Sequence, residues 1–151
     1  MSVDGLREDF EYWLADMDDA IERFLGGVAS RVSERLDLSP ASLDVLEAWI
    51  VERYASTEAM LAPSESRIVD GLARYIGETF RKAIGGRWEI RFDDSKYVFY
   101  GKPQLTDFWD KPTPVCPLSL ATAAADRRTG EFLSGVLASY LRDKERKEGR
   151  A

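Results

Sequence analysis

The chain has 151 residues, of which 44% are apolar and 32% are charged, so it can form a hydrophobic core and is not a disordered or collagen-like protein. Its 27 acidic residues outnumber its 21 basic residues and give a net charge of −6, which argues against a nucleic-acid partner. It contains no histidine and one cysteine, which excludes imidazole catalysis, internal disulfides and cysteine-ligated metal clusters. We therefore expect no cofactor, no metal site and no enzymatic activity.

The N-terminal segment does not resemble a targeting signal. Its first residues are acidic rather than basic and apolar, unlike a secretory signal peptide. No apolar run approaches the roughly 20 residues that a membrane-spanning helix needs, and the single thiol of Cys116 fits a reducing compartment. We therefore expect a cytoplasmic protein without a membrane partner, and the oligomeric state stays open.

Residues 1–25 carry the whole net charge, because they hold eight acids and two bases whereas residues 26–151 hold 19 of each. Apolar residues recur there at steps of three and four, with the acids on the opposite side. This predicts one amphipathic helix to about residue 25 and, after Gly26-Gly27, a second helix or a kinked continuation to about Leu36. Its acidic side is either a recognition surface for a basic protein or a solvated face that only provides solubility. The residues assigned to this surface are Asp9, Asp16, Asp18 and Asp19.

Two further helices are predicted before residue 86. Ser39-Pro40 is a favourable helix start, and Gly85-Gly86 ends the later helix. Trp49, Ile76 and Phe80 lie on the apolar arcs and are predicted to be buried. Gly77 lies inside a helix, where glycine costs about 1 kcal/mol relative to alanine, so we expect another element to cross close to it.

The later helix carries charged residues along one flank, at spacings that let Asp70 pair with Arg74 and Arg74 pair with Glu78. Two interpretations are open. Arg74, Glu78 and Arg81 form a polar site, or they belong to an ordinary ion-paired surface whose pairs contribute little to stability.

The hydrophobic period changes to two over residues 88–92, and 93–96 is typical of a turn before a second strand over 97–100. A proline-rich loop follows, and helices are predicted again from Leu118 and over 132–141, with a charged tail at 142–151 expected to fray. The predicted fold class is α+β. It is a single domain, mainly helical, with a small antiparallel sheet built on a hairpin near residues 87–100.

The middle of the chain is rich in aromatic residues, which either form the inner face of the sheet or provide a binding platform. These residues are Trp88, Tyr97, Phe99, Tyr100, Phe108 and Trp109. Trp109 lies in the proline-rich loop between two aspartates, so we expect it to be the exposed anchor for a partner.

Four segments carry a resemblance: residues 46–49 (LEAW) with 52–54 (ERY), 74–82 (RYIGETFRK) and 85–89 (GGRWE). They resemble a group of small uncharacterised bacterial proteins, of actinobacterial type, with a Y-x-G-E helix followed by a G-G-x-W strand. Similar helix-to-strand segments occur in some immunity-type proteins of bacterial toxin systems. The resemblance implies an α+β fold and an immunity-like role, and it carries no known chemistry.

These observations favour a non-enzymatic interaction protein, immunity- or antitoxin-like, that presents its acidic helix to a basic partner such as a nuclease-type toxin. The alternative is a small-ligand-binding or accessory domain with an aromatic pocket near the hairpin. An enzyme that relies on carboxylates alone, such as Glu78 with Asp93, is the least favoured hypothesis.

Overall fold

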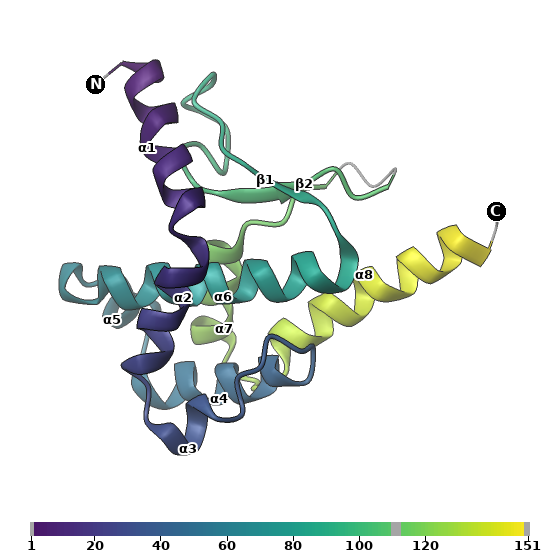
Figure 1. Cartoon of the computed structure of the whole chain (residues 1–151). Coiled ribbons are helices and arrows are strands. Elements are labelled where there is room, and N and C mark those ends of the chain that lie inside the picture. The colour runs from purple at the N-terminus through teal and green to yellow at the C-terminus, as the bar shows by residue number, and fades with distance from the viewer. Residues whose placement is uncertain (1, 110–112, 150–151) are drawn as a thin grey trace.

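The computed structural model describes residues 2–109 and 113–149. It is mainly helical with one two-stranded antiparallel sheet, which confirms the predicted α+β class (Figure 1). The elements in chain order are α1 (Val3–Ala15), α2 (Met17–Gly26), α3 (Ser30–Ser33), α4 (Ser42–Arg53), α5 (Thr57–Met60), a 3-10 helix (Pro63–Glu65), α6 (Ser66–Ile84), β1 (Arg87–Glu89), β2 (Gln104–Thr106), α7 (Pro117–Arg127) and α8 (Phe132–Gly149). None of the described helices combines the length and hydropathy needed to span a bilayer.

Helix α6 lies across the middle of the molecule and packs against α2, α7 and α8 (Figure 1). Ile76 and Phe80 are fully buried, as predicted. Trp49, predicted to be largely buried, is partly buried and packs against the same core. Its ring meets the edges of Phe24 and Tyr54 at the border of a cleft between α2 and α4, so one side of the indole stays open to solvent.

The predicted N-terminal helix is divided at Asp16 into α1 and α2. Backbone hydrogen bonds cross the division, from Asp16 N–H to the Tyr12 carbonyl (3.1 Å) and from Ala20 N–H to the Asp16 carbonyl (2.8 Å), so the helix is kinked rather than interrupted. Beyond α2 the predicted helix to Leu36 is reduced to the single turn of α3. Because of the kink, the apolar residues of α1 and those of α2 pack against different elements of the fold.

Helix α2 crosses α6 at Gly71, where a side chain would not fit. A Cβ atom at this position would lie 2.6 Å from the Cβ of Phe24. The absence of a side chain at Gly71 therefore allows Phe24 to reach the core, where it is 8% exposed.

The second strand of the sheet is not the predicted one. Strand β1 pairs with β2, with Trp88 opposite Leu105, whereas residues 97–100 form turns inside the connecting segment. Amide groups of Tyr97 and Tyr100 donate to carbonyls three residues earlier, and these local bonds replace strand pairing. Residues 97–100 are four consecutive large apolar residues and lack the alternation of a half-buried strand. This pattern is compatible with a turn conformation.

Helix α8 is tied to α4 by a buried carboxylate. Glu47 is fully buried, and its two oxygens accept the backbone N–H groups of Phe132 (3.0 Å) and Leu133 (2.7 Å) in the first turn of α8. The carboxylate thereby satisfies two donors that a helix N-terminus leaves free. The tail expected to fray is instead helical as far as Gly149 and projects from the rest of the molecule (Figure 1); residues 150–151 lie outside the described part.

Candidate functional site

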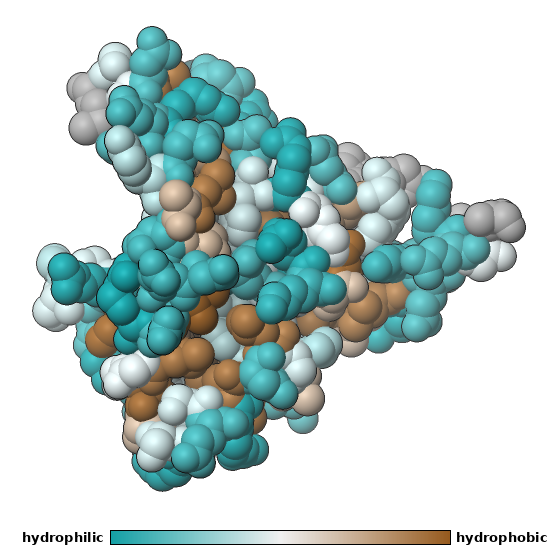
Figure 2. Space-filling model, viewed as in Figure 1, coloured by the Kyte–Doolittle hydropathy of each residue, from teal (hydrophilic) through white to brown (hydrophobic). Residues whose placement is uncertain are grey.

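The acidic side chains of α1 and α2 gather on their outer surfaces, which Figure 2 shows as hydrophilic. We call the exposed set the acidic face; it consists of Asp4, Glu8, Asp9, Glu11, Asp18, Asp19 and Glu22. Of the four aspartates predicted to bind a partner, Asp9, Asp18 and Asp19 belong to it. Their side chains form no hydrogen bond or ion pair with any other described residue, so their carboxylates are open to an external cation.

Asp16 differs from the other three predicted aspartates, because it is half-buried at the kink. It accepts a hydrogen bond from Arg23, whose Nη2 lies 2.5 Å from Oδ2 of Asp16. This hydrogen bond holds the pKa of the Asp16 carboxyl below its ordinary value. Asp16 therefore differs from the acidic face in having an internal partner, and its predicted contact with a binding partner stays a prediction.

The two basic residues of these helices hydrogen-bond to groups outside the acidic face. Arg23 is bound to Asp16, and Arg7 donates to the Glu89 carboxylate and to the Ile90 carbonyl, both at 3.2 Å. One aromatic residue stands among the acids: Tyr12, which is 68% exposed. Sequence reasoning missed Tyr12, although its position outside the apolar seam indicates an exposed side chain.

The predicted polar site separates into two halves of a structural cluster, which we call the indole junction: Trp13, Asp70, Arg74, Glu78, Arg81 and Trp88. In its first half Arg74 is 4% exposed. Its Nε donates to Asp70 Oδ2 (2.7 Å), its Nη1 donates to the Trp13 carbonyl (2.8 Å), and its guanidinium lies 4.2 Å from the Trp13 ring centroid. The Asp70–Arg74 pair is confirmed, and the predicted Arg74–Glu78 pair does not form.

In the second half Glu78 is 5% exposed and accepts from Arg81 Nε (2.7 Å) and Trp88 Nε1 (3.1 Å). Burial opposes ionisation of Glu78, but the hydrogen bonds from Arg81 and Trp88 outweigh it and hold the pKa of the carboxyl below its ordinary value. Across the described residues every buried side-chain nitrogen and oxygen has a hydrogen-bond partner. The buried polar atoms of the indole junction are thus all hydrogen-bonded, and the cluster joins α1, α6 and β1; a binding role for Arg74, Glu78 and Arg81 stays a prediction.

Gly77 explains why β1 can reach the indole junction. A Cβ atom at Gly77 would clash with the Trp88 ring and lie 3.0 Å from Pro117 Cγ, which confirms that other elements cross here. The Y-x-G-E helix and the G-G-x-W strand are thus two sides of one contact, in which Gly77 makes room for the indole and Glu78 binds its N–H. Packing accounts for both sequence patterns.

Trp109 is less exposed than predicted. It is half-buried with a positive φ of 38°, and its ring centroid lies 6.1 Å from that of the buried Phe108. A cleft of about 270 Å³ lies beside Trp88 of β1 and is lined by residues from α1, α6 and α7 as well. We call it the hairpin-side cleft; Trp13, Leu61, Trp88, Pro103 and Leu118 are among its lining residues.

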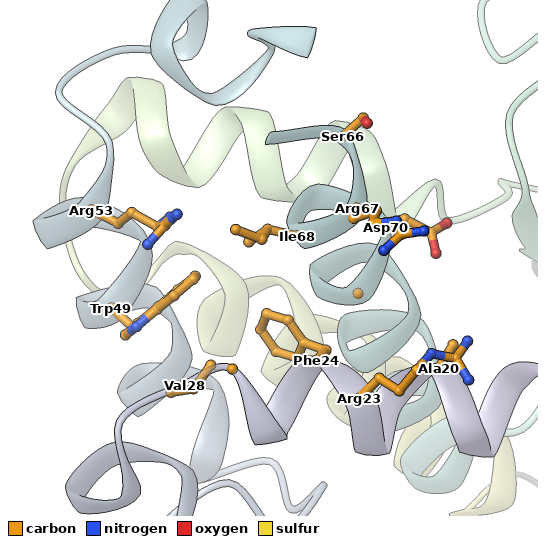
Figure 3. Close-up of a pocket in the computed structure, with 12 residues that line it drawn as sticks. Ala20, Arg23, Phe24, Val28, Trp49, Arg53, Ser66, Arg67, Ile68 and Asp70 are labelled. Atoms are coloured by element: carbon orange, nitrogen blue, oxygen red, sulfur yellow. The ribbon is translucent and has the colours of Figure 1, made fainter. Parts of the chain in front are cut away.

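The larger cleft lies between α2, α4 and α6 and has a volume of about 720 Å³. Figure 2 shows hydrophobic residues in the recess between α2 and α4, and Figure 3 shows the aromatic and arginine side chains from three helices that line it. We call it the arginine cleft; its main lining residues are Arg23, Phe24, Trp49, Arg53, Arg67 and Ile68. The sequence analysis missed this site, because its residues come from three helices whose packing cannot be read from spacing.

Searches against protein-family models, curated proteins and solved structures find no match to this chain. No relative therefore assigns a role to any of these residues.

Proposed function

We propose that this chain is a non-enzymatic interaction protein, immunity- or antitoxin-like, that binds a basic protein through the acidic face of α1 and α2. One observation carries the proposal: seven acids and Tyr12 are exposed on α1 and α2, while both basic residues of the same helices hydrogen-bond to residues outside this set. A face that served solubility alone would more typically interleave acids with bases at i,i+4 spacing.

The acidic face suits recognition in two ways. Carboxylates without internal partners attract a basic protein over distances of about a Debye length, roughly 8 Å at physiological salt, and speed its association. Tyrosine is enriched among the residues that contribute most to binding energy, because its ring is large and its hydroxyl can still bond to a partner. Tyr12 supplies that anchor within the charged surface.

A basic groove of a nuclease-type toxin is the partner chemistry that fits best. Such a groove binds phosphates through arginine and lysine, and a row of carboxylates on a helix offers the same negative charge without a substrate. Asp9 and Asp19 lie on successive parts of this row, on α1 and α2 respectively.

The test is affinity capture of basic proteins by the purified chain at low and high salt. We expect a partner that is retained at about 50 mM salt and released at about 500 mM, and that Tyr12→Ala loses even at low salt. Val98→Ala is the matched control, because Val98 is 71% exposed and lies in the loop after β1. Retention by the Tyr12 variant equal to that of the control would contradict the proposal.

A second candidate function is binding of a small apolar molecule in the hairpin-side cleft. The specific observation is that Trp13 and Trp88 both line this cleft, with their ring centroids 5.0 Å apart. Native mass spectrometry of the protein from its host tests it, because a bound molecule adds a discrete mass. A spectrum of the bare chain, together with salt-sensitive capture of a basic protein, favours the first function.

A further inference from the structure

We propose that the arginine cleft binds a small aromatic carboxylate. This ligand class is independent of the acidic face, because Asp9, Asp18 and Asp19 do not line the cleft. Its volume of about 720 Å³ lies within the range of small-molecule sites, which is roughly 300–1,000 Å³.

The inner part of the cleft suits a flat apolar group. Phe24 from α2 and Trp49 from α4 meet edge to face with ring centroids 5.8 Å apart, and Ile68 from α6 lies between the arginines (Figure 3). Phe24 is buried, whereas Trp49 and Ile68 are half-buried, so they keep apolar surface that faces the cleft. A ring placed here would cover surface that water now contacts.

The outer part of the cleft is basic although the protein is acidic. Arg23, Arg53 and Arg67 come from α2, α4 and α6, and Asp70 is the only acid among the lining residues. Asp70 is already engaged, since it accepts from Trp13 Nε1 (2.8 Å) and from Arg74 Nε (2.7 Å). Positive charge at the cleft therefore exceeds what Asp70 alone could offset, although Arg23 and Arg53 are also paired with Asp16 and Glu65 outside the lining.

The three arginines differ in whether their guanidinium groups already form hydrogen bonds within the protein. Arg53 donates to both oxygens of Glu65 at 3.1 Å and stands 5.3 Å from the Trp49 ring centroid, and Arg23 is bound to Asp16. Arg67 is exposed and has no hydrogen bond or ion pair within the described residues. One free guanidinium beside an apolar floor matches one carboxylate, which arginine can bind through two parallel hydrogen bonds.

A polyanion fits this arrangement less well than a monoanion. Asp16 and Glu65 hold two of the three arginines, so a ligand with several phosphates would meet their carboxylates as well as the free Arg67. A single carboxylate on a ring needs only Arg67 and the apolar floor, and that is the ligand class to which the charges point.

The experiment titrates 2-naphthoate into the full chain labelled with nitrogen-15, with the Trp49 indole N–H signal identified through Trp49→Phe. We expect that signal and the amides of residues 66–68 to shift together, with a dissociation constant on the order of 1 mM or tighter. Naphthalene-2-methanol, which keeps the ring but lacks the charge, should bind at least about tenfold more weakly. Equal binding of the two probes, or shifts confined to residues outside the cleft, would overturn the proposal.

Arg67→Gln tests the residue assigned to the carboxylate. Because Arg67 is exposed and unpartnered, the variant should fold normally and lose about tenfold in affinity for 2-naphthoate. Arg142→Gln is the matched control, since Arg142 is exposed on α8 and does not line the cleft. Affinity of the Arg67 variant equal to that of the Arg142 variant would show that the arginine cleft does not bind carboxylates.

Discussion

The indole junction and the acidic face are both rich in charge, yet they differ in what the charges touch. In the junction Arg74 and Glu78 are buried, and each is bound by side chains or backbone of other elements. On the acidic face Asp9 and Asp18 are exposed and have no direct partner within the described chain. The two regions therefore differ not in how many charged residues they contain but in whether those residues have hydrogen-bond partners within the protein. Charged side chains with internal hydrogen-bond partners stabilise this fold, whereas exposed charged side chains without such partners are accessible to another molecule.

The largest effect should follow from removing the buried cation of the indole junction. Arg74→Met keeps most of the side-chain volume but leaves the Trp13 carbonyl and Oδ2 of Asp70 without the Arg74 donor, while Oδ1 of Asp70 still accepts from Trp13 Nε1. Breaking a fully buried ion pair costs about 3–5 kcal/mol, and since Asp70 is half-exposed we expect a loss of about 2–4 kcal/mol in the free energy of unfolding, measured in urea. Arg67→Met, on the same helix but exposed, should change it by less than about 0.5 kcal/mol.

A similar stability loss for the two arginine variants would contradict the distinction drawn between satisfied and unsatisfied charges. Circular dichroism of both proteins at pH 7 would show that each keeps its helices before the urea curves are compared.

Adding one methyl group at the contact between α6 and β1 should have the next largest effect. Gly77→Ala places a Cβ atom against the Trp88 ring, and overpacking of this kind costs typically about 1–3 kcal/mol. This outweighs the roughly 1 kcal/mol that alanine gains in helix propensity. A lower melting temperature is expected by calorimetry, and a higher one would show that the indole can move aside.

The ionisation of Glu78 should make a smaller contribution that depends on pH. Its pKa in the folded protein is below its unfolded value, so the ionised carboxylate stabilises the fold above the unfolded value of about 4.3. This contribution is lost as the pH falls through the lower folded pKa. Because its partner Arg81 is half-exposed, we expect it to be worth only about 1 kcal/mol.

Urea unfolding of the natural chain and of Glu78→Gln at several pH values measures this contribution. The difference in unfolding free energy between them should be constant near neutral pH and shrink in acid. A difference that stays constant down to the lowest pH at which both fold would contradict the role given to the Glu78 charge.

The acidic face should give the smallest effect on stability and the clearest effect on binding. Replacing Asp9, Asp18 and Asp19 by asparagine removes no contact within the described structure, so the unfolding free energy should change by less than about 0.5 kcal/mol. Association with a basic partner should be slower at low salt and should depend less on salt. Stopped-flow measurements at two salt concentrations test this.

The matched control removes the same charge elsewhere, through Glu58→Gln, Asp126→Asn and Glu145→Gln, which are exposed on other helices. If both triple variants slow association equally, net charge rather than the acidic face drives the encounter. An unchanged on-rate in the acidic-face variant would remove these aspartates from the functional surface.

Sequence reasoning succeeded where the cause is local or periodic. The buried arc of α6 follows from the 3.6-residue period, and the crossing at Gly77 follows from a glycine that helix propensity disfavours. It failed where the partner lies far along the chain. Strand β2 replaces residues 97–100 because Trp88 pairs with Leu105, and nothing in the local pattern selects that register.

Local sequence patterns also predicted only part of the candidate sites. Exposure of Asp9, Asp18 and Asp19 follows from their place opposite the apolar seam, whereas the bond between Asp16 and Arg23 depends on the kink. The arginine cleft was out of reach, because Arg23, Arg53 and Arg67 look like ordinary surface residues until three helices are packed together.

The buried carboxylate of Glu47 has a consequence for the order in which this protein assembles during synthesis. The amide groups that bind it, those of Phe132 and Leu133, follow it by 85 and 86 residues. While the ribosome makes that stretch, Glu47 has no backbone partner and keeps its water, so α4 cannot settle into its final place. Helix α8, which is made after α4, is thus the one that closes the core around Glu47, and α4 reaches its final packing only once α8 is present.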